Sequence, residues 1–323
     1  MQHGELLEFA LELLEAAGLD EWSRQTVAES LCTASLCGNE THGVRLLAGY
    51  CASSRDGFMN GSPSYTITQP YPASAVIDAD RGFGLAAGCR AIDIGVQLAE
   101  KFGVATVAVI NSRHAGPMSA YTTRAAERGC MAMAMTNTPP AMRMLNGVRP
   151  FFGTNPIAFA APRPHSQGPF SLDMATTAMA NGKLGLLASA GKPIPGGVMH
   201  KEDGSTPLTE PHDFMTNGPA LVESVGIEPA GPIAAHKGFG LAAMVEILCA
   251  VLPGQKLTRE NVGDSLVKPS QLPGEAAHDK EPDTPVGAPR QRDGAEWGQW
   301  FLVLKVDSVI SQAAFVEGMG ALR

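Results

Sequence analysis

Hydrophobic residues in the first part of the chain recur with the spacing of helices. Apolar positions return every three or four residues across residues 4–17, which predicts an amphipathic helix, and similar patterns predict helices over residues 21–37 and 44–52. Residues 53–73 are rich in Ser, Pro and Gly, which is typical of a loop, with a short strand around residues 65–67 as the alternative. We therefore expect a helical N-terminal part over residues 1–73.

The middle of the chain alternates between short apolar runs and helical patterns. The apolar runs are rich in Val, Ile and Ala and predict buried strands, with helices between them. Strands are expected over residues 74–78, 104–110, 131–135 and 157–160, and helices over residues 85–102, 119–128 and 237–252. This order predicts an α/β region over residues 74–254 that carries the binding sites.

The last part of the chain divides into two segments. Residues 255–298 are rich in Pro, Gly and charged residues, which predicts a long surface loop. Residues 300–306 predict a strand, and residues 310–322 begin with a helical pattern. We expect the segment 299–323 to pack with the helical N-terminal part.

Composition and charge narrow the class of protein. The 323 residues are 44% hydrophobic and 17% charged, which is typical of a globular protein, and the net charge of -8 argues against a nucleic-acid partner. The chain has no apolar run of roughly 18 residues and begins with an acidic amphipathic segment, so we expect no membrane span and a cytoplasmic location. The six cysteines are scattered, which favours buried thiols over disulfides or a metal site.

Residues 75–110 imitate a dinucleotide-binding unit. Gly82, Gly84 and Gly88 fall between a predicted strand and a predicted helix. In the dinucleotide fingerprint the third glycine comes one position earlier and an acidic residue ends the second strand, whereas this strand ends in Asn111. We therefore interpret the glycines as a tight turn rather than as a phosphate-binding loop.

Two of the eight histidines are candidates for proton transfer, because the pKa of histidine lies near neutral pH. His42 follows the second predicted helix, and the hydroxyl of Thr41 can orient its ring. His114 follows a predicted buried strand, a common position for active-site groups. Lys237 begins a predicted helix, where free N–H groups favour a phosphate or a carboxylate.

These candidates belong to blocks that occur in a fixed order. The blocks are Thr41-His42-Gly43-Val44-Arg45-Leu46-Leu47, Asn111-Ser112-Arg113-His114, Thr136-Asn137-Thr138, Gly153-Thr154-Asn155-Pro156, Leu172-Asp173-Met174-Ala175-Thr176-Thr177 and His236-Lys237-Gly238-Phe239-Gly240. The ordered set resembles the type-2 malate/L-lactate dehydrogenase family, which includes ureidoglycolate, sulfolactate, diketogulonate and cyclic imino acid oxidoreductases. The resemblance implies an α/β, non-Rossmann NAD(P)-binding fold that consists of a mixed sheet with flanking helices. It also implies a homodimer.

The resemblance assigns roles to individual residues. It implies that His42 is the proton donor with Thr41 as its partner, and that His114 is either a cofactor contact or the acid/base itself. The implied cofactor contacts are His114, Thr138, Asp173, Met174, Ala175, Lys183, His236, Lys237 and Gly238, and the implied substrate contacts are Arg45, Thr154 and Asn155. The resemblance implies NAD or NADP as the cofactor, with NADPH slightly favoured.

Two departures from the family pattern matter for this assignment. Arg45 lies three residues after His42, whereas the family arginine lies four after, and on a helix this rotates the guanidinium by about 100°. Residues 115–118 read Ala-Gly-Pro-Met where the family commonly has Phe-Gly. An arginine that meets the ribose 2′ position would decide between NAD and NADP; the candidates are Arg113, Arg124, Arg143 and Arg149.

The sequence therefore predicts an NAD(P)-dependent oxidoreductase that transfers a hydride to or from the carbon next to a carboxylate. The first choice of substrate is a small 2-oxo or 2-hydroxy acid such as malate or lactate. The alternative is a cyclic imine, Δ1-piperideine- or Δ1-pyrroline-2-carboxylate, reduced with NADPH. The alternative of another class is a relative that binds NAD(P)H without turnover.

Overall fold

The computed structural model describes residues 2–144, 150–200, 209–210, 221–222, 235–260 and 296–321. Its helices are α1 (His3–Ala16), α2 (Glu21–Leu36), α3 (Leu47–Arg55), α4 (Gly84–Phe102), α5 (Ser119–Ala126), α6 (Asn181–Ser189), α8 (Ala235–Glu246) and α9 (Gln312–Ala321). The longer strands are β1 (Thr66–Tyr71), β2 (Ser74–Asp78), β3 (Val104–Ser112), β4 (Cys130–Thr136), β7 (Ile157–Ala161), β8 (Phe170–Met174) and β11 (Trp297–Lys305).

A seven-stranded mixed sheet organises the fold, with the order β1-β2-β3-β11-β4-β7-β8. The strands β2 and β3 pair in parallel, and the other neighbours pair antiparallel. A second sheet joins four short strands, β6 (Pro150–Phe152), β5 (Met142–Arg143), β10 (Leu221–Val222) and β9 (Met199–His200). The expected mixed sheet with flanking helices and a helical N-terminal part is confirmed.

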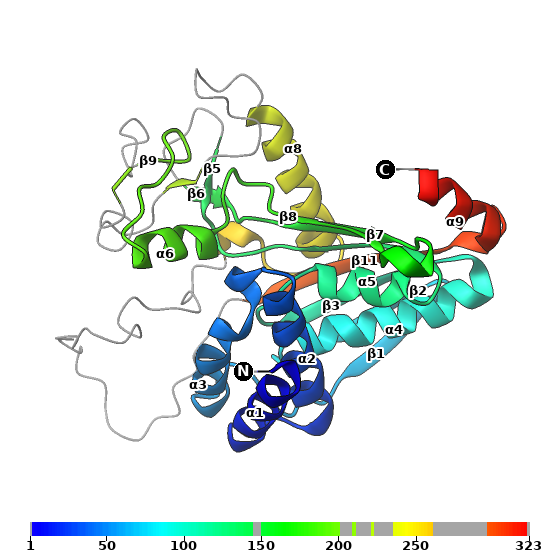
Figure 1. Ribbon diagram of the computed structural model, residues 1–323, viewed down its shortest axis with the longest axis horizontal. Coiled ribbons are helices and arrows are strands. Elements are labelled where there is room, and N and C mark those ends of the chain that lie inside the picture. Colours follow the sequence, from blue (N-terminus) through cyan, green and yellow to red (C-terminus); the bar gives the residue numbers. More distant parts are fainter. Residues whose placement is uncertain are drawn as a thin grey trace.

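The two faces of the large sheet carry different helices. In Figure 1, α4 and α5 lie on one side of this sheet and α8 lies on the other. Along β4 the residues alternate accordingly: Ala132 and Ala134 face the core under α5, whereas Met133 and Met135 pack with Val245 of α8. This period of two is the ordinary consequence of strand geometry, and at β4 both faces of the sheet are covered.

The glycines at the turn between β2 and α4 and in the first turns of α4 allow close packing. A Cβ at Gly84 would lie 2.2 Å from the carbonyl oxygen of Arg113, and a Cβ at Gly88 would lie 2.5 Å from the ring of Tyr121. Glycine allows α4 to approach its neighbours more closely than any side chain would permit. The glycines of this βαβ unit thus serve helix packing, in agreement with the interpretation as a turn.

The N-terminal helices form a layer beside α4. α1 packs on α2 and α3, and α2 packs on α4, so the hydrophobic core runs continuously from α1 into the sheet. The predicted helices over residues 4–17 and 21–37 match α1 and α2 closely. Of the predicted helix over residues 44–52, the first turn is the 3₁₀ helix η2 (Val44–Leu46), and α3 continues to Arg55.

The strand predicted near the C-terminus lies at the centre of the large sheet. β11 is inserted between β3 and β4, where Phe301 and Val303 enter the core under α4. The expectation was that the segment 299–323 packs with the N-terminal helices; its strand instead completes the sheet, because an apolar strand satisfies its backbone between two neighbours. Most of the loop expected over residues 255–298 lies outside the described residues, and Thr258 and Trp297 at its two ends are buried.

Among the helices of the described ranges, none combines the length and the apolar character needed to cross a membrane.

Candidate active site

The loop that carries His42 returns tightly against α2. Gly43 follows the 3₁₀ helix η1 (Glu40–His42), and a Cβ there would lie 2.1 Å from Oγ of Ser35. The same hydroxyl accepts the backbone N–H of Val44 at 3.1 Å. Only glycine fits so close an approach, which explains why it follows the histidine.

His114 lies just beyond β3, where the chain leaves the sheet. The backbone N–H of Arg113 donates to the carbonyl of Gly82 at 3.1 Å, which ties this strand end to the turn before α4. The imidazole rings of His42 and His114 stack, with centroids 5.9 Å apart and planes inclined by 10°. The fold therefore brings together the two histidines predicted for proton transfer. We refer to them as the histidine pair.

Each ring of the histidine pair is held through Nδ1. The hydroxyl of Thr41 lies 2.8 Å from Nδ1 of His42, and the hydroxyl of Tyr50, in α3, lies 2.6 Å from Nδ1 of His114. Trp297 packs edge-on against His114, with centroids 5.0 Å apart. Within the part of the chain that the structure describes, neither Nε2 atom has a hydrogen-bond partner, so each ring keeps one nitrogen for a ligand.

Burial lowers the pKa of both imidazoles. For His114, burial and the neighbouring His42 lower the pKa to about 3. For His42, burial lowers the pKa, the negative charge of Asp173 raises it, and the positive charge of Arg45 lowers it further. Both rings are therefore neutral near pH 7. The pKa of His42 is the more adjustable of the two because a carboxylate faces that ring.

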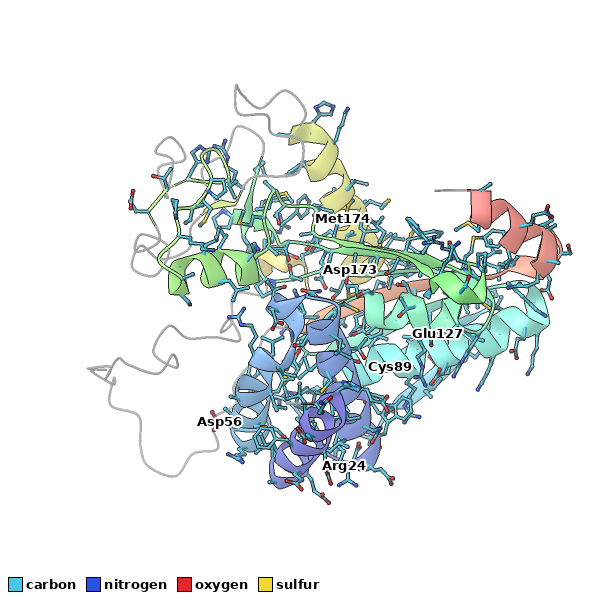
Figure 2. The ribbon with its side chains drawn as sticks, viewed as in Figure 1. Arg24, Asp56, Cys89, Glu127, Asp173 and Met174 are labelled. Carbon is cyan, nitrogen blue, oxygen red and sulfur yellow. The ribbon has the colours of Figure 1, made fainter. Side chains whose placement is uncertain are left out.

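Asp173 lies at the end of β8, between the histidine pair and α5. Its carboxylate accepts the backbone N–H of Ser119 at 2.8 Å, in the first turn of α5, where a negative charge is favourable. Figure 2 shows Asp173 and Met174 near the middle of the molecule, above the N-terminal helices. Asp173 thus has a structural task as a helix cap and an electrostatic effect on His42.

Arg45 reaches toward the first turn of α6. Its Nη1 lies 3.4 Å from the carbonyl oxygen of Gly182, and a Cβ at Gly182 would lie 3.0 Å from Cβ of Thr41. The guanidinium is exposed and lies close enough to His42 to affect its pKa. The displaced arginine of the sequence is therefore near the histidine pair, with Lys183 following in the same helix.

Asn155 lies at the centre of a second polar cluster, together with Thr138, Thr154, Glu246 and Thr258. The side chain of Asn155 is 0% exposed and accepts the N–H of Thr138 at 3.1 Å. Its amide donates to the carbonyl of Ala242 at 3.1 Å and to Glu246 at 3.4 Å. We call this set the Asn155 cluster. It joins the strand ends near β4 and β7 to α8.

The comparison with known families decides the class. A family model described as malate/L-lactate dehydrogenase matches residues 1–323. The chain belongs to the malate/L-lactate dehydrogenase family.

Relatives within this family are similar over most of the chain. A malate dehydrogenase of Pyrococcus abyssi is 37% identical over 77% of this chain and 67% of its own length. A (2R)-3-sulfolactate dehydrogenase (NADP(+)) of Chromohalobacter salexigens is 36% identical over 76% of this chain and 69% of its own. The solved malate dehydrogenase of Pyrococcus horikoshii OT3 superposes with a TM-score of 0.80 at 27% identity, covering 100% of this chain and 80% of that one.

The remaining residues that the family resemblance implied as cofactor contacts lie on exposed element ends. Met174 is 38% exposed at the end of the edge strand β8, and Ala175 follows it half-buried. His236 and Lys237 are exposed in the first turn of α8, with Gly238 buried behind them. These positions can be reached by a ligand, and their roles stay predictions.

The arginines considered for a ribose 2′-phosphate lie in different surroundings. Arg113 is buried, donates from Nε to the carbonyl of Phe58 at 3.0 Å and stacks on that ring. Arg124 pairs with Asp93 through two contacts of 2.8 Å. Arg143 is half-buried in β5, and Arg149 lies outside the described residues. The engaged guanidinium groups of Arg113 and Arg124 are poor choices for a phosphate contact.

Sequence analysis did not single out Asn39, Tyr50, Trp297 or Glu246. Tyr50 carried a usable signal, since a tyrosine hydroxyl inside an apolar helix needs a polar partner. Trp297 comes from the far end of the chain, and its contact with His114 depends on the position of β11. Such a contact has no local signature in the sequence.

Proposed function

We propose that the protein is an NAD(P)-dependent oxidoreductase that interconverts a small 2-hydroxy acid and its 2-oxo acid. The observation that carries the proposal is the histidine pair: two neutral imidazoles stacked at 5.9 Å, each with Nε2 without a protein partner among the described residues. Membership of the malate/L-lactate dehydrogenase family supports the same reaction type.

The residues present fit a nicotinamide dinucleotide. β8 is an edge strand with all five residues exposed, so its outer side is open to a ligand beside Asp173 and Met174. The exposed first turn of α8 offers Lys237 to a phosphate. We propose that these residues, together with Thr138, Ala175, Lys183 and His236, hold the cofactor. When bound, the cofactor accepts or supplies the hydride.

The protein side chains then carry the proton and orient the substrate. In the oxidation direction, Nε2 of His42 accepts the hydroxyl proton while the C–H bond of the same carbon breaks; in the reduction direction, the protonated His42 returns it. Arg45 binds the substrate carboxylate, which a guanidinium recognises through paired N–H donors. The Asn155 cluster forms the support of the pocket, so Thr154 and Asn155 act by shaping it.

Steady-state assays test the proposal. The purified protein is mixed with malate, lactate or 3-sulfolactate and with NAD+ or NADP+, and the formation of reduced nicotinamide is followed by absorbance. We expect turnover with at least one 2-hydroxy acid. Reduction of Δ1-piperideine-2-carboxylate without any activity on hydroxy acids would contradict the proposed substrate class. Binding of NAD(P)H without any turnover would contradict the proposal that the protein is an enzyme.

The proposal extends to the cofactor preference, the oligomeric state and the location of the protein. We propose NADPH as the preferred reductant, and the NADP(+) in the name of the Chromohalobacter relative supports this. We also propose a homodimer, as the family resemblance implies, and a reducing cytoplasmic setting. The six free cysteines, five of them buried, support the latter.

A further inference from the structure

The partners of His42 fix the position of its ring proton. The hydroxyl of Thr41 donates to Oδ1 of Asn39 at 2.8 Å and lies 2.8 Å from Nδ1 of His42. A hydroxyl has one proton to donate. Because that proton points to Asn39, Nδ1 of His42 must carry a proton of its own and donate to the Thr41 oxygen. In the neutral ring, Nε2 then carries a lone pair.

The partner of His114 has the opposite effect. The hydroxyl of Tyr50 lies 2.6 Å from Nδ1 of His114, and Tyr50 is only 1% exposed. Burial raises the pKa of Tyr50 far above its usual value, so the phenol keeps its proton. Within the described residues, Nδ1 of His114 is the hydrogen-bond partner of this hydroxyl, which therefore donates to it. The proton of the neutral His114 ring consequently resides on Nε2.

We propose that Asn39 and Tyr50 are positioning residues that hold the histidine pair in opposite tautomers. His42 presents an Nε2 lone pair that takes up the substrate proton, and His114 presents an Nε2–H that donates a hydrogen bond to the substrate oxygen. The assignment gives the two histidines different tasks, which sequence analysis left open. Its catalytic half rests on the proposed oxidoreductase function.

The surroundings of the pair agree with this division. Asp173 on β8 and Arg45 on η2 are the charged groups that influence the pKa of His42, so its protonation can change during the reaction. His114 is surrounded by Tyr50, the edge of Trp297 and the face of His42, and within the described residues no carboxylate shifts its pKa. A ring in such surroundings is suited to a fixed neutral donor.

Nitrogen NMR of the full chain tests the tautomers directly and without turnover. Protein labelled with ¹⁵N-histidine is measured near neutral pH, where protonated and unprotonated ring nitrogens have widely separated shifts, and His42→Asn and His114→Asn assign the signals. We expect Nδ1–H for His42 and Nε2–H for His114. The same tautomer on both rings, or the reverse pattern, would overturn the proposal even if the enzyme is active.

Variants of the two positioning residues complete the test. Tyr50→Phe should give His114 a mixed tautomer and leave the His42 signals in place. The control Tyr65→Phe, at a tyrosine that packs against Arg90, should change neither. Asn39→Leu should release the His42 tautomer, and Asn39→Asp, which still accepts from Thr41, should retain it. If Asn39→Asp behaves as Asn39→Leu does, Asn39 acts by packing alone.

Kinetics separate positioning from a general structural role. With an active hydroxy acid, Tyr50→Phe should lower kcat by about 10-fold or more, as expected when an orienting partner of a catalytic imidazole is lost. KM for the cofactor should change little. A loss of kcat with both tautomers intact in the NMR spectra would contradict the proposal, and absence of turnover in the unaltered protein would count against the proposed function only.

Discussion

The histidine pair and the Asn155 cluster are both polar groups within the α/β region and its border. Sequence analysis predicted both histidines as site residues and, of the Asn155 cluster, Thr138, Thr154 and Asn155. The pair and the cluster differ in what their hydrogen-bonding atoms do. Asn155 is 0% exposed and its amide is used entirely within the protein, by Thr138, Ala242 and Glu246. In the histidine pair, each ring uses Nδ1 to fix its orientation and leaves Nε2 free of partners among the described residues.

This difference distinguishes polar residues that support the fold from polar residues that can act on a substrate. A buried polar group that is satisfied on every side stabilises a unique arrangement and has nothing left to offer a substrate. A group that is fixed on one side and open on the other can exchange a proton in a defined geometry. On this basis we propose that the histidine pair carries the chemistry and that the Asn155 cluster supports it.

The largest effect is expected from His42→Asn. Asparagine keeps a polar side chain but cannot take up a proton, so kcat should fall by roughly 100-fold or more. The thermal unfolding temperature should stay close to that of the unaltered protein, because the ring lies in a half-buried loop. Steady-state kinetics and calorimetry on the same sample check both. An unchanged kcat would transfer the proton to His114 and remove the distinction between the two rings.

The reverse outcome is expected from Glu246→Ala in the Asn155 cluster. Glu246 is 5% exposed and accepts both the N–H and the hydroxyl of Thr258, each at 2.6 Å. Its removal leaves buried donors unsatisfied and should lower the free energy of unfolding by about 2–4 kcal/mol. Denaturant unfolding measures this, with exposed Glu8→Ala as control.

The activity of Glu246→Ala completes that test. Corrected for the folded fraction, kcat should remain within about threefold of the unaltered value, since supporting groups act on stability before chemistry. A loss as large as that of His42→Asn, with unfolding unchanged, would place Glu246 in the chemistry and break the comparison between the two clusters.

A smaller effect is expected from pH. The free energy of unfolding should depend on pH through the titration of His114. Because the folded pKa of His114 is lowered to about 3, the unfolded chain binds its proton first as the pH falls below the ordinary value for histidine. The free energy of unfolding is therefore highest above that value, where the ring is neutral in both the folded and the unfolded state. It decreases as the pH falls below that value. Between about pH 6.5 and pH 5 the loss should be at most about 2 kcal/mol for this one residue.

The variant His114→Asn isolates that contribution. Urea unfolding at the two pH values should show a smaller pH-dependent loss for the variant than for the unaltered protein, since asparagine does not titrate. An equal decrease in the free energy of unfolding in both proteins would mean that His114 titrates normally. That result would contradict a neutral hydrogen-bond donor at this position.

Much of the fold could be predicted from the sequence, because the local patterns are strong. The helices α1 and α2 and the strand β2 follow from apolar periodicity almost to the residue. β8 was not predicted, since all its residues are exposed and it shows no alternation. The central place of β11 was not predictable either, because the pairing of Trp297 with Ser112 joins distant parts of the chain.

The candidate site also has features that the sequence predicts and features that only the tertiary fold determines. His42, Thr41 and His114 were predicted as site residues from local blocks and from the resemblance, whereas the stacking of the two rings depends on the tertiary fold. Asn155 was expected to contact substrate, but its own side chain is consumed by Thr138 and α8. Sequence patterns indicate which residue types are present; the free or occupied state of each polar atom emerges only when distant elements meet.

The most direct test of the account is the pH dependence of kcat/KM for oxidation of the best 2-hydroxy acid. The neutral form of His42 must accept the proton, and burial lowers its pKa from the ordinary 6.5. The account predicts that log kcat/KM rises with pH, levels off at a pKa below that ordinary value, and loses this inflection in His42→Asn. An inflection that persists unchanged in the variant, or a profile that is flat throughout the acidic range, would contradict it.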